Sequence, residues 1–309
     1  MGDIAPASIV SLIASATEIL CSLGLRDRLV GVSHECDFPE DIKGLPVLSA
    51  PKVDPALPAG EIDRRVRAIV AEGLSVYRIR TEELARVRPD LIVTQDQCEV
   101  CAVSLKDVEE AVSALTLKAT RVCSLRPNTL EDIVEDFRRV AAAAGVTERG
   151  EVLVEWFSER LANVRERTSR AARRPTVACL EWLDPVMVAG GWMPELVRIA
   201  GGEPLLVTEV ERFRKVEWDR LAEADPDVIV VMPCGFTIDR TLAELGDTRT
   251  AETLRGMRAT REGRCFLADG NAYFNRPGPR IADSAEILAV LLRQEILGET
   301  LGARRWPAG

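Results

Sequence analysis

The chain has 309 residues, of which 47% are hydrophobic and 29% are charged. This length exceeds the usual size of a single hydrophobic core and predicts two domains. The formal net charge of -9 at pH 7 offers no basic surface for phosphates, which argues against nucleic acid as a partner. No apolar stretch approaches the roughly 20 residues of a membrane-spanning helix, so we expect no direct membrane insertion.

The first part of the chain predicts strands and helices in alternation. A buried strand at 9–13 leads into a helix that ends before Gly24, and a second strand follows at 29–33. A proline-rich loop covers residues 52–60. The elements expected after it are a helix at 62–73, a short strand at 74–77, a helix at 81–87, a strand at 91–94, a helix at 105–115 and a strand at 119–124.

The middle of the chain, from 128 to 172, is rich in Ala, Glu and Arg and predicts helix with an interruption at Gly145. After it the alternation resumes. The expected elements are a strand at 176–180, helices at 193–200 and 218–222, strands at 228–232 and 265–267, and a helix at 282–292. Alternation of this kind is typical of parallel sheets covered by helices. We therefore predict an N-terminal α/β lobe over 1–128, a connecting long helix over 129–173 and a C-terminal α/β lobe over 174–309.

A similar line occurs in both halves of the chain. Arg88-Pro89-Asp90-Leu91-Ile92-Val93 and Asp225-Pro226-Asp227-Val228-Ile229-Val230 each join a polar helical segment to a buried strand, and a cysteine follows each strand. The repeat indicates two related lobes. Because ligands bind beyond the carboxyl ends of strands in open parallel sheets, it also indicates where to look for a site.

The only histidine and several cysteines follow predicted strand ends. His34 and Cys36 follow the strand at 29–33, Cys98 and Cys101 the strand at 91–94, and Cys234 the strand at 228–232. Imidazole and thiolate ligate zinc and iron–sulfur clusters, so His34, Cys36, Cys98 and Cys101 are candidate metal ligands. Cys98 and Cys101 also have the spacing of a redox dithiol. The ordinary alternative, a small core residue, is the expected role of Cys21, Cys123, Cys179 and Cys265.

Aromatic and polar residues gather in two segments of the second half. Glu181 and Trp182 end one strand and Trp192 follows shortly after. The dense loop at 269–280 carries Tyr273, Phe274 and Arg276. Aromatic side chains beside hydrogen-bonding groups suit a large planar ligand. The chain has no GxGxxG after a strand, no phosphate loop and no GxSxG motif, so we expect a binding protein and no enzyme.

These segments resemble a known family, the substrate-binding proteins of iron-siderophore and vitamin B12 ABC importers. The resemblance rests on residues 9–20, 29–33 with 37–39, 45–47, 88–93, 195–202 and the loop from Arg276 to Arg280. The resemblance implies two Rossmann-like lobes with mainly parallel sheets bridged by a long α-helix, the class III type, with a metal chelate in the cleft between them. The segments around His34 and Cys98 are similar to the cobalamin-binding subgroup, which implies a cobalamin-like corrinoid as ligand.

By this resemblance the ligand-binding residues are Cys36, Asp37, Phe38, Gln95, Gln97, Cys98, Glu181, Trp182, Trp192, Cys234, Tyr273, Phe274 and Arg276. An ABC permease is the partner that the family implies. The N-terminus shows no basic segment followed by an apolar one, so the sequence as written predicts a cytoplasmic carrier. A truncated start would instead place the protein in the periplasm or at the cell surface.

Overall fold

A computed structural model describes residues 5–72, 74–95, 105–115, 119–170, 173–208, 211–246, 248–293 and 302–306. The chain divides into two compact units, the first formed by 1–57 and 61–156 and the second by 58–60 and 157–309. The boundary falls inside the long helix α6 (Thr147–Ser169), which gives its first part to one unit and the rest to the other. Within the described ranges no helix is long and apolar enough to cross a membrane.

The first unit is built on a parallel sheet in the order β2-β1-β5-β6. Its strands are β1 (Ile9–Ser11), β2 (Leu29–Val32), β5 (Leu91–Gln95) and β6 (Arg121–Leu125). The register places Ser11 beside Val93, and Val93 beside Cys123. All residues of β1 and β5 are buried, as expected for strands covered by helices on both faces.

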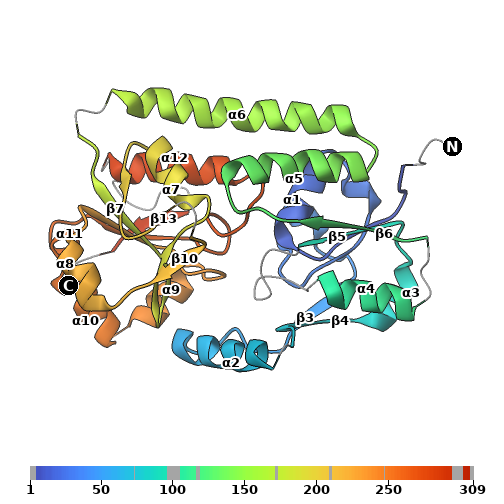
Figure 1. Ribbon diagram of the computed structural model, residues 1–309, viewed down its shortest axis with the longest axis horizontal. Coiled ribbons are helices and arrows are strands. Elements are labelled where there is room, and N and C mark those ends of the chain that lie inside the picture. The colour runs from blue at the N-terminus through green and yellow to red at the C-terminus, as the bar shows by residue number, and fades with distance from the viewer. Residues whose placement is uncertain are drawn as a thin grey trace. The chain divides into compact units, whose positions relative to one another are not determined.

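Helices cover both faces of this sheet (Figure 1), with α1 (Ala14–Ser22) and α5 (Leu130–Ala143) on one face and α3 (Thr81–Val87) and α4 (Leu105–Ala114) on the other. Helix α5 begins with a capping box in which Thr129 and Asp132 each bond the backbone N–H of the other. The remaining elements are η1 (Arg26–Arg28), η2 (Glu40–Ile42), α2 (Ala59–Ala71) and the antiparallel pair β3 (Ser49–Pro51) and β4 (Tyr77–Ile79).

The second unit has a mixed sheet in the order β10-β8-β7-β11-β12-β13, with β9 also paired to β7. Its centre, β7 (Thr176–Leu183), β11 (Val228–Val231) and β12 (Cys265–Ala268), is parallel. The edges are antiparallel: β8 (Val186–Ala189) and β10 (Phe213–Lys215) on one side and β13 (Ala303–Arg305) on the other. Strand β9 (Glu203–Pro204) is short.

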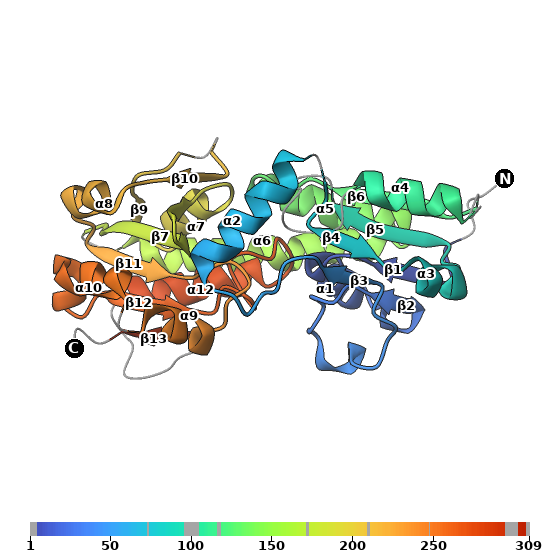
Figure 2. The same ribbon diagram turned by 90° about the horizontal axis from the view of Figure 1, so that it is seen from below.

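Helices α7 (Met193–Ile199) and α12 (Ile281–Leu292) lie on one face of the second sheet, and α8 (Trp218–Ala224), α9 (Ile238–Leu245), α10 (Arg249–Gly256) and α11 (Arg258–Arg261) lie on the other (Figures 1 and 2). The second part of α6 is fixed to this unit by Thr168, whose hydroxyl donates to the Ile199 carbonyl at 2.7 Å. Arg160 pairs with Asp283 and Glu286 of α12.

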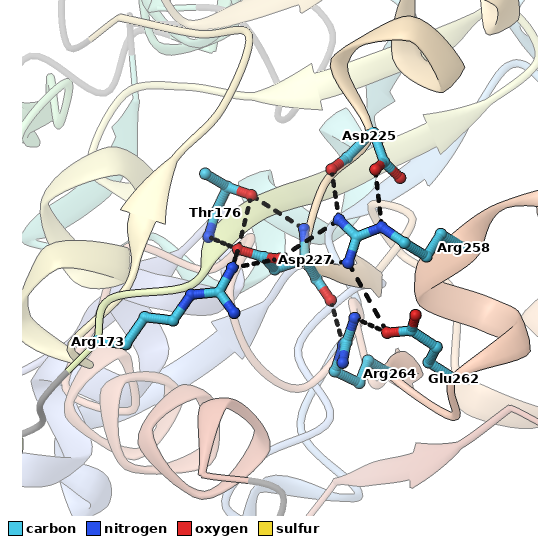
Figure 3. Close-up of polar contacts among 7 residues, drawn as sticks. All are labelled: Arg173, Thr176, Asp225, Asp227, Arg258, Glu262 and Arg264. Carbon is cyan, nitrogen blue, oxygen red and sulfur yellow. Dashed lines mark hydrogen bonds and ion pairs between the residues drawn. The ribbon is translucent and has the colours of Figure 1, made fainter.

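The repeated Pro-Asp line forms the same structure in both units. Arg88 and Asp225 end helices α3 and α8 with φ of 43° and 42°. The aspartate that follows each proline then bonds the start of the neighbouring strand: Asp90 accepts from the backbone N–H and hydroxyl of Ser8, and Asp227 accepts from those of Thr176 (Figure 3). These aspartates lie at the amino ends of the strands, opposite the expected ligand edge.

The fold class predicted from the sequence is confirmed, since the structure has two α/β units, largely parallel central sheets and one long helix common to both. Helix α3 has the predicted bounds, whereas the strand expected at 74–77 begins only at Tyr77. The antiparallel strands β8, β10 and β13 and the helices α9, α10 and α11 were not predicted.

Candidate functional site

The carboxyl edge of the first sheet carries a polar and aromatic group centred on His34, which lies two residues beyond β2. The imidazole Nδ1 lies 2.7 Å from the Ser49 hydroxyl, and the same hydroxyl accepts from the His34 backbone N–H at 3.2 Å. The Tyr77 ring packs against His34 at 5.2 Å between centroids, and its hydroxyl donates to Glu35 at 3.0 Å. Burial, together with the nearby Arg80, lowers the pKa of His34 to about 4, so the ring is neutral at pH 7.

Cys36 belongs to the same edge. Its sulfur lies 3.0 Å from the Thr17 hydroxyl, which also donates to Ser11 at 2.8 Å. Thr17 is on the first turns of α1 and Ser11 ends β1, so these contacts fix the turn after β2 to the end of the central strand. The next two residues, Asp37 and Phe38, are exposed, and Phe38 leaves 42% of its surface open to solvent.

Gln95 ends β5 at the same edge and is buried, and its side-chain nitrogen has no hydrogen-bond partner among the residues that the structure describes. Gln97, Cys98 and Cys101 lie outside the described residues, so the four-ligand metal site and the redox dithiol stay predictions. Among the residues that the structure describes, no group of three His, Cys, Asp or Glu side chains is placed to hold a metal ion.

The cysteines expected in the core are found there. Cys123, Cys179 and Cys265 are buried in strands, and Cys21 is partly buried on α1. Burial raises the pKa of Cys123 to about 11 and of Cys179 and Cys265 to about 12. These thiols stay protonated and packed at neutral pH, which makes them unsuited to metal binding or nucleophilic chemistry.

The carboxyl edge of the second sheet presents an aromatic group. Trp182, on β7, packs against Phe236 with a centroid distance of 5.3 Å, and the Arg240 guanidinium lies 4.5 Å above the Phe236 ring. Arg240 also pairs with Glu244 at 2.9 Å. The backbone N–H of Cys234 donates to the Glu181 carbonyl at 3.0 Å, which ties the turn after β11 to the end of β7. Cys234 is exposed and Glu181 partly exposed.

The loop at 269–280 is fixed to this edge by its own side chains. Asp269 accepts from the backbone N–H groups of Asn271 and Ala272 at 2.9 and 2.8 Å. Asn275 donates to the carbonyls of Met232 and Gly270 at 3.0 and 3.1 Å, so it ties the loop to the end of β11. Gly270 is needed at its position because a Cβ atom there would lie 2.1 Å from the Pro233 carbonyl oxygen.

Trp192 joins the loop from the start of α7, where its indole N–H donates to the Phe274 carbonyl at 2.8 Å. Phe274 itself is fully buried with φ of 59°, so its side chain supports the loop from inside. Arg276 is largely buried and donates to the Asn271 side chain at 3.0 Å. Tyr273 lies under the Arg280 guanidinium at 5.4 Å.

The predicted site residues that the structure describes therefore form two groups, one on each unit. The first unit carries His34, Cys36, Asp37, Phe38 and Gln95, and the second carries Glu181, Trp182, Trp192, Cys234, Tyr273, Phe274 and Arg276. Sequence reasoning missed Ser49, Tyr77, Phe236 and Arg240. Position alone could have indicated Phe236, which follows Cys234 by two residues beyond a buried strand.

Two α/β units joined by a long helix, each with polar and aromatic loops at the carboxyl edge of its sheet, define a protein that binds a small ligand. Comparison of the sequence with known families identifies the family to which the chain belongs. The chain matches the family described as periplasmic binding protein over residues 9–272, and it belongs to that family. Its members are substrate-binding proteins and not enzymes, as predicted from the sequence.

The similarity to named relatives extends over most of the chain. The vitamin B12-binding protein of Vibrio parahaemolyticus is 22% identical over 274 residues, which cover 88% of this chain and 84% of the relative. That of Yersinia pseudotuberculosis is 23% identical over 283 residues, 91% of this chain and 84% of the relative. None of the relatives named here is an iron–sulfur protein, so they do not favour that alternative.

Solved structures share the fold. A periplasmic heme-binding protein from Pseudomonas aeruginosa superposes with a TM-score of 0.73 at 20% identity, covering 98% of this chain and 100% of that one. The periplasmic vitamin B12-binding protein of Vibrio cholerae gives 0.66 at 18% identity, covering 94% of this chain and 97% of that one. Both similarities support the class III binding-protein architecture.

Proposed function

We propose that this protein binds a cobalamin-like corrinoid without transforming it, using the residues at the carboxyl edges of its two sheets. The observation that carries the proposal is the edge of the second unit. There the partly exposed Trp182 indole packs on the buried Phe236 ring, beside a loop that Asn275 and Trp192 hold by hydrogen bonds. A rigid aromatic surface flanked by hydrogen-bonding groups suits a large, flat chelate with polar side arms.

The names of the relatives support a corrinoid within the class of metal chelates, because the proteins from Vibrio parahaemolyticus and Yersinia pseudotuberculosis are both named for vitamin B12. Heme is the second candidate, since the fold is shared with the heme-binding protein of Pseudomonas aeruginosa. We also propose that the protein hands its ligand to an ABC permease, and the family description supports the exported location over the cytoplasmic one.

The test is a titration of purified protein with aquocobalamin and, separately, with hemin, followed by calorimetry and by the visible absorption of the ligand. We expect saturable one-to-one binding of the corrinoid with a dissociation constant in the micromolar range or below, and weaker binding of hemin. Tight binding of hemin alone would replace the corrinoid with a porphyrin. If neither ligand binds at micromolar concentrations, the proposed function is wrong.

A further inference from the structure

The contacts of His34 resemble those of a metal-binding histidine whose ring is oriented by a neighbouring residue, here Ser49. Imidazoles that coordinate metals almost always donate a hydrogen bond from their other ring nitrogen to an oxygen, which fixes the tautomer and the orientation of the ring. The Ser49 hydroxyl lies 2.7 Å from Nδ1 of His34. Its oxygen has two lone pairs and can accept both from Nδ1–H and from the His34 backbone N–H.

The other ring nitrogen, Nε2, has no hydrogen-bond partner among the described residues. When Nδ1 carries the proton toward the Ser49 oxygen, the lone pair of the ring lies on Nε2, where a metal could bind it.

The ring is also fixed in space by packing. The Ser49 hydroxyl and the Tyr77 ring reach it from the two strands of the antiparallel pair β3–β4, where Pro51 pairs with Tyr77 and Ser49 with Ile79. Tyr77 is fixed in turn by its hydrogen bond to Glu35, the residue after His34. A partly buried imidazole held on two sides loses little side-chain entropy when it binds a metal.

We infer that Nε2 of His34 coordinates the metal at the centre of the bound chelate, and that this protein therefore favours chelates with an exchangeable axial position. This inference rests on the proposed function. With aquocobalamin the step is a ligand exchange: the Nε2 lone pair forms a bond to cobalt, the bond from cobalt to its axial water breaks, and the water leaves. Cobalt keeps its oxidation state and no proton is transferred.

The experiment compares aquocobalamin, whose axial water exchanges, with methylcobalamin, whose axial carbon does not. The wild-type protein should bind aquocobalamin at least tenfold more tightly and shift its visible bands as nitrogen replaces water, with no shift for methylcobalamin. His34→Ala should bind both forms with similar affinity and give no shift. His34→Gln serves as a second variant of closer size, and far-UV circular dichroism with urea unfolding confirms that each variant is folded.

Ser49→Ala is the positioning control. It leaves the imidazole in place and removes the oxygen that orients it, so it should retain the band shift with an affinity for aquocobalamin reduced about tenfold or more. Equal binding of both corrinoids by the wild-type protein, or an unchanged band shift in folded His34→Ala, would overturn the inference and leave the proposed function standing. If the wild-type protein binds neither corrinoid, both are wrong.

Discussion

Asp227 and Thr176 bond each other in both directions. The Asp227 carboxylate accepts from the Thr176 backbone N–H at 3.0 Å and from its hydroxyl at 3.2 Å, and the Asp227 backbone N–H donates to the Thr176 hydroxyl oxygen at 2.9 Å (Figure 3). Asp90 and Ser8 make the same exchange in the first unit, with distances of 3.0, 3.0 and 3.1 Å. In each unit the aspartate of the repeated Pro-Asp segment therefore links its own strand to the start of the neighbouring strand by hydrogen bonds.

Asp227→Ala should lower the free energy of unfolding by about 2–3 kcal/mol, because Asp227 is buried and its removal leaves Thr176 and nearby arginines without their acceptor. Asp225→Ala is the matched control: its carboxylate is exposed and pairs with Arg258 at the surface, so the loss should be below about 1 kcal/mol. Urea unfolding measures both. Equal losses for the two variants would contradict a structural role for Asp227.

The counterpart Asp90 makes a prediction about pH. Hydrogen bonds from the backbone and side chain of Ser8 lower the pKa of Asp90. Since the folded pKa lies below the unfolded value, the stabilisation is present above the unfolded pKa of about 4 and is lost as the pH falls through the folded pKa. Asp90→Asn should therefore show a weaker fall in unfolding free energy below pH 4 than the wild-type protein. Urea unfolding at a series of pH values measures both proteins, and equal slopes below pH 4 would contradict this account of Asp90.

Gly270 and Gly235 provide a pair of matched substitutions at the edge of the second unit. Gly270→Ala places a Cβ atom 2.1 Å from the Pro233 carbonyl oxygen, so backbone must move and we expect a loss of more than 2 kcal/mol. Gly235→Ala meets no atom of the described residues within 4 Å and has only its φ of +75° to accommodate, which costs about 1 kcal/mol. Thermal unfolding compares the two. A smaller loss for Gly270→Ala than for Gly235→Ala would show that the loop is not packed as described.

The sequence was sufficient for the central elements, because the buried strands β5 and β11 are rich in β-branched residues and α3 shows a helical pattern followed by a Pro-Asp break. It was insufficient for short edge strands: β10 is exposed at every residue and carries no hydrophobic pattern. The N-caps Thr237 and Thr248 were usable signals for α9 and α10.

The candidate site also has residues that the sequence indicated and contacts that it did not. His34, Trp182 and Cys234 were predicted as site residues because they lie at or just after the ends of hydrophobic runs that the sequence shows to be strands. The contacts of His34 with Ser49 and Tyr77 were not predictable, since they depend on the pairing of β3 with β4, two strands that lie more than 20 residues apart in the chain. The local pattern of hydrophobic and polar residues does not show which distant strands pair or in which register.

Asn275 should control ligand affinity through the loop at 269–280. Its side chain donates to the Met232 and Gly270 carbonyls, so Asn275→Ala releases the loop from the end of β11 and adds an entropic cost to binding. We expect the dissociation constant for aquocobalamin to rise about tenfold, which corresponds to about 1.4 kcal/mol. Asn163→Ala, at an exposed position on α6, is the control and should bind as the wild-type protein does.

Trp182→Ala is the direct test of the aromatic surface. Loss of the indole removes its contact with Phe236 and the stacking area offered to a flat chelate, so the dissociation constant for aquocobalamin should rise tenfold or more. Trp156→Ala is the matched control, because Trp156 lies on α6 with 42% of its surface exposed and takes no part in either group of site residues. The same titration reports on both variants, with quenching of tryptophan fluorescence as a second signal. If Trp182→Ala and Trp156→Ala bind the corrinoid equally well, the ligand does not contact the edge of the second unit at Trp182.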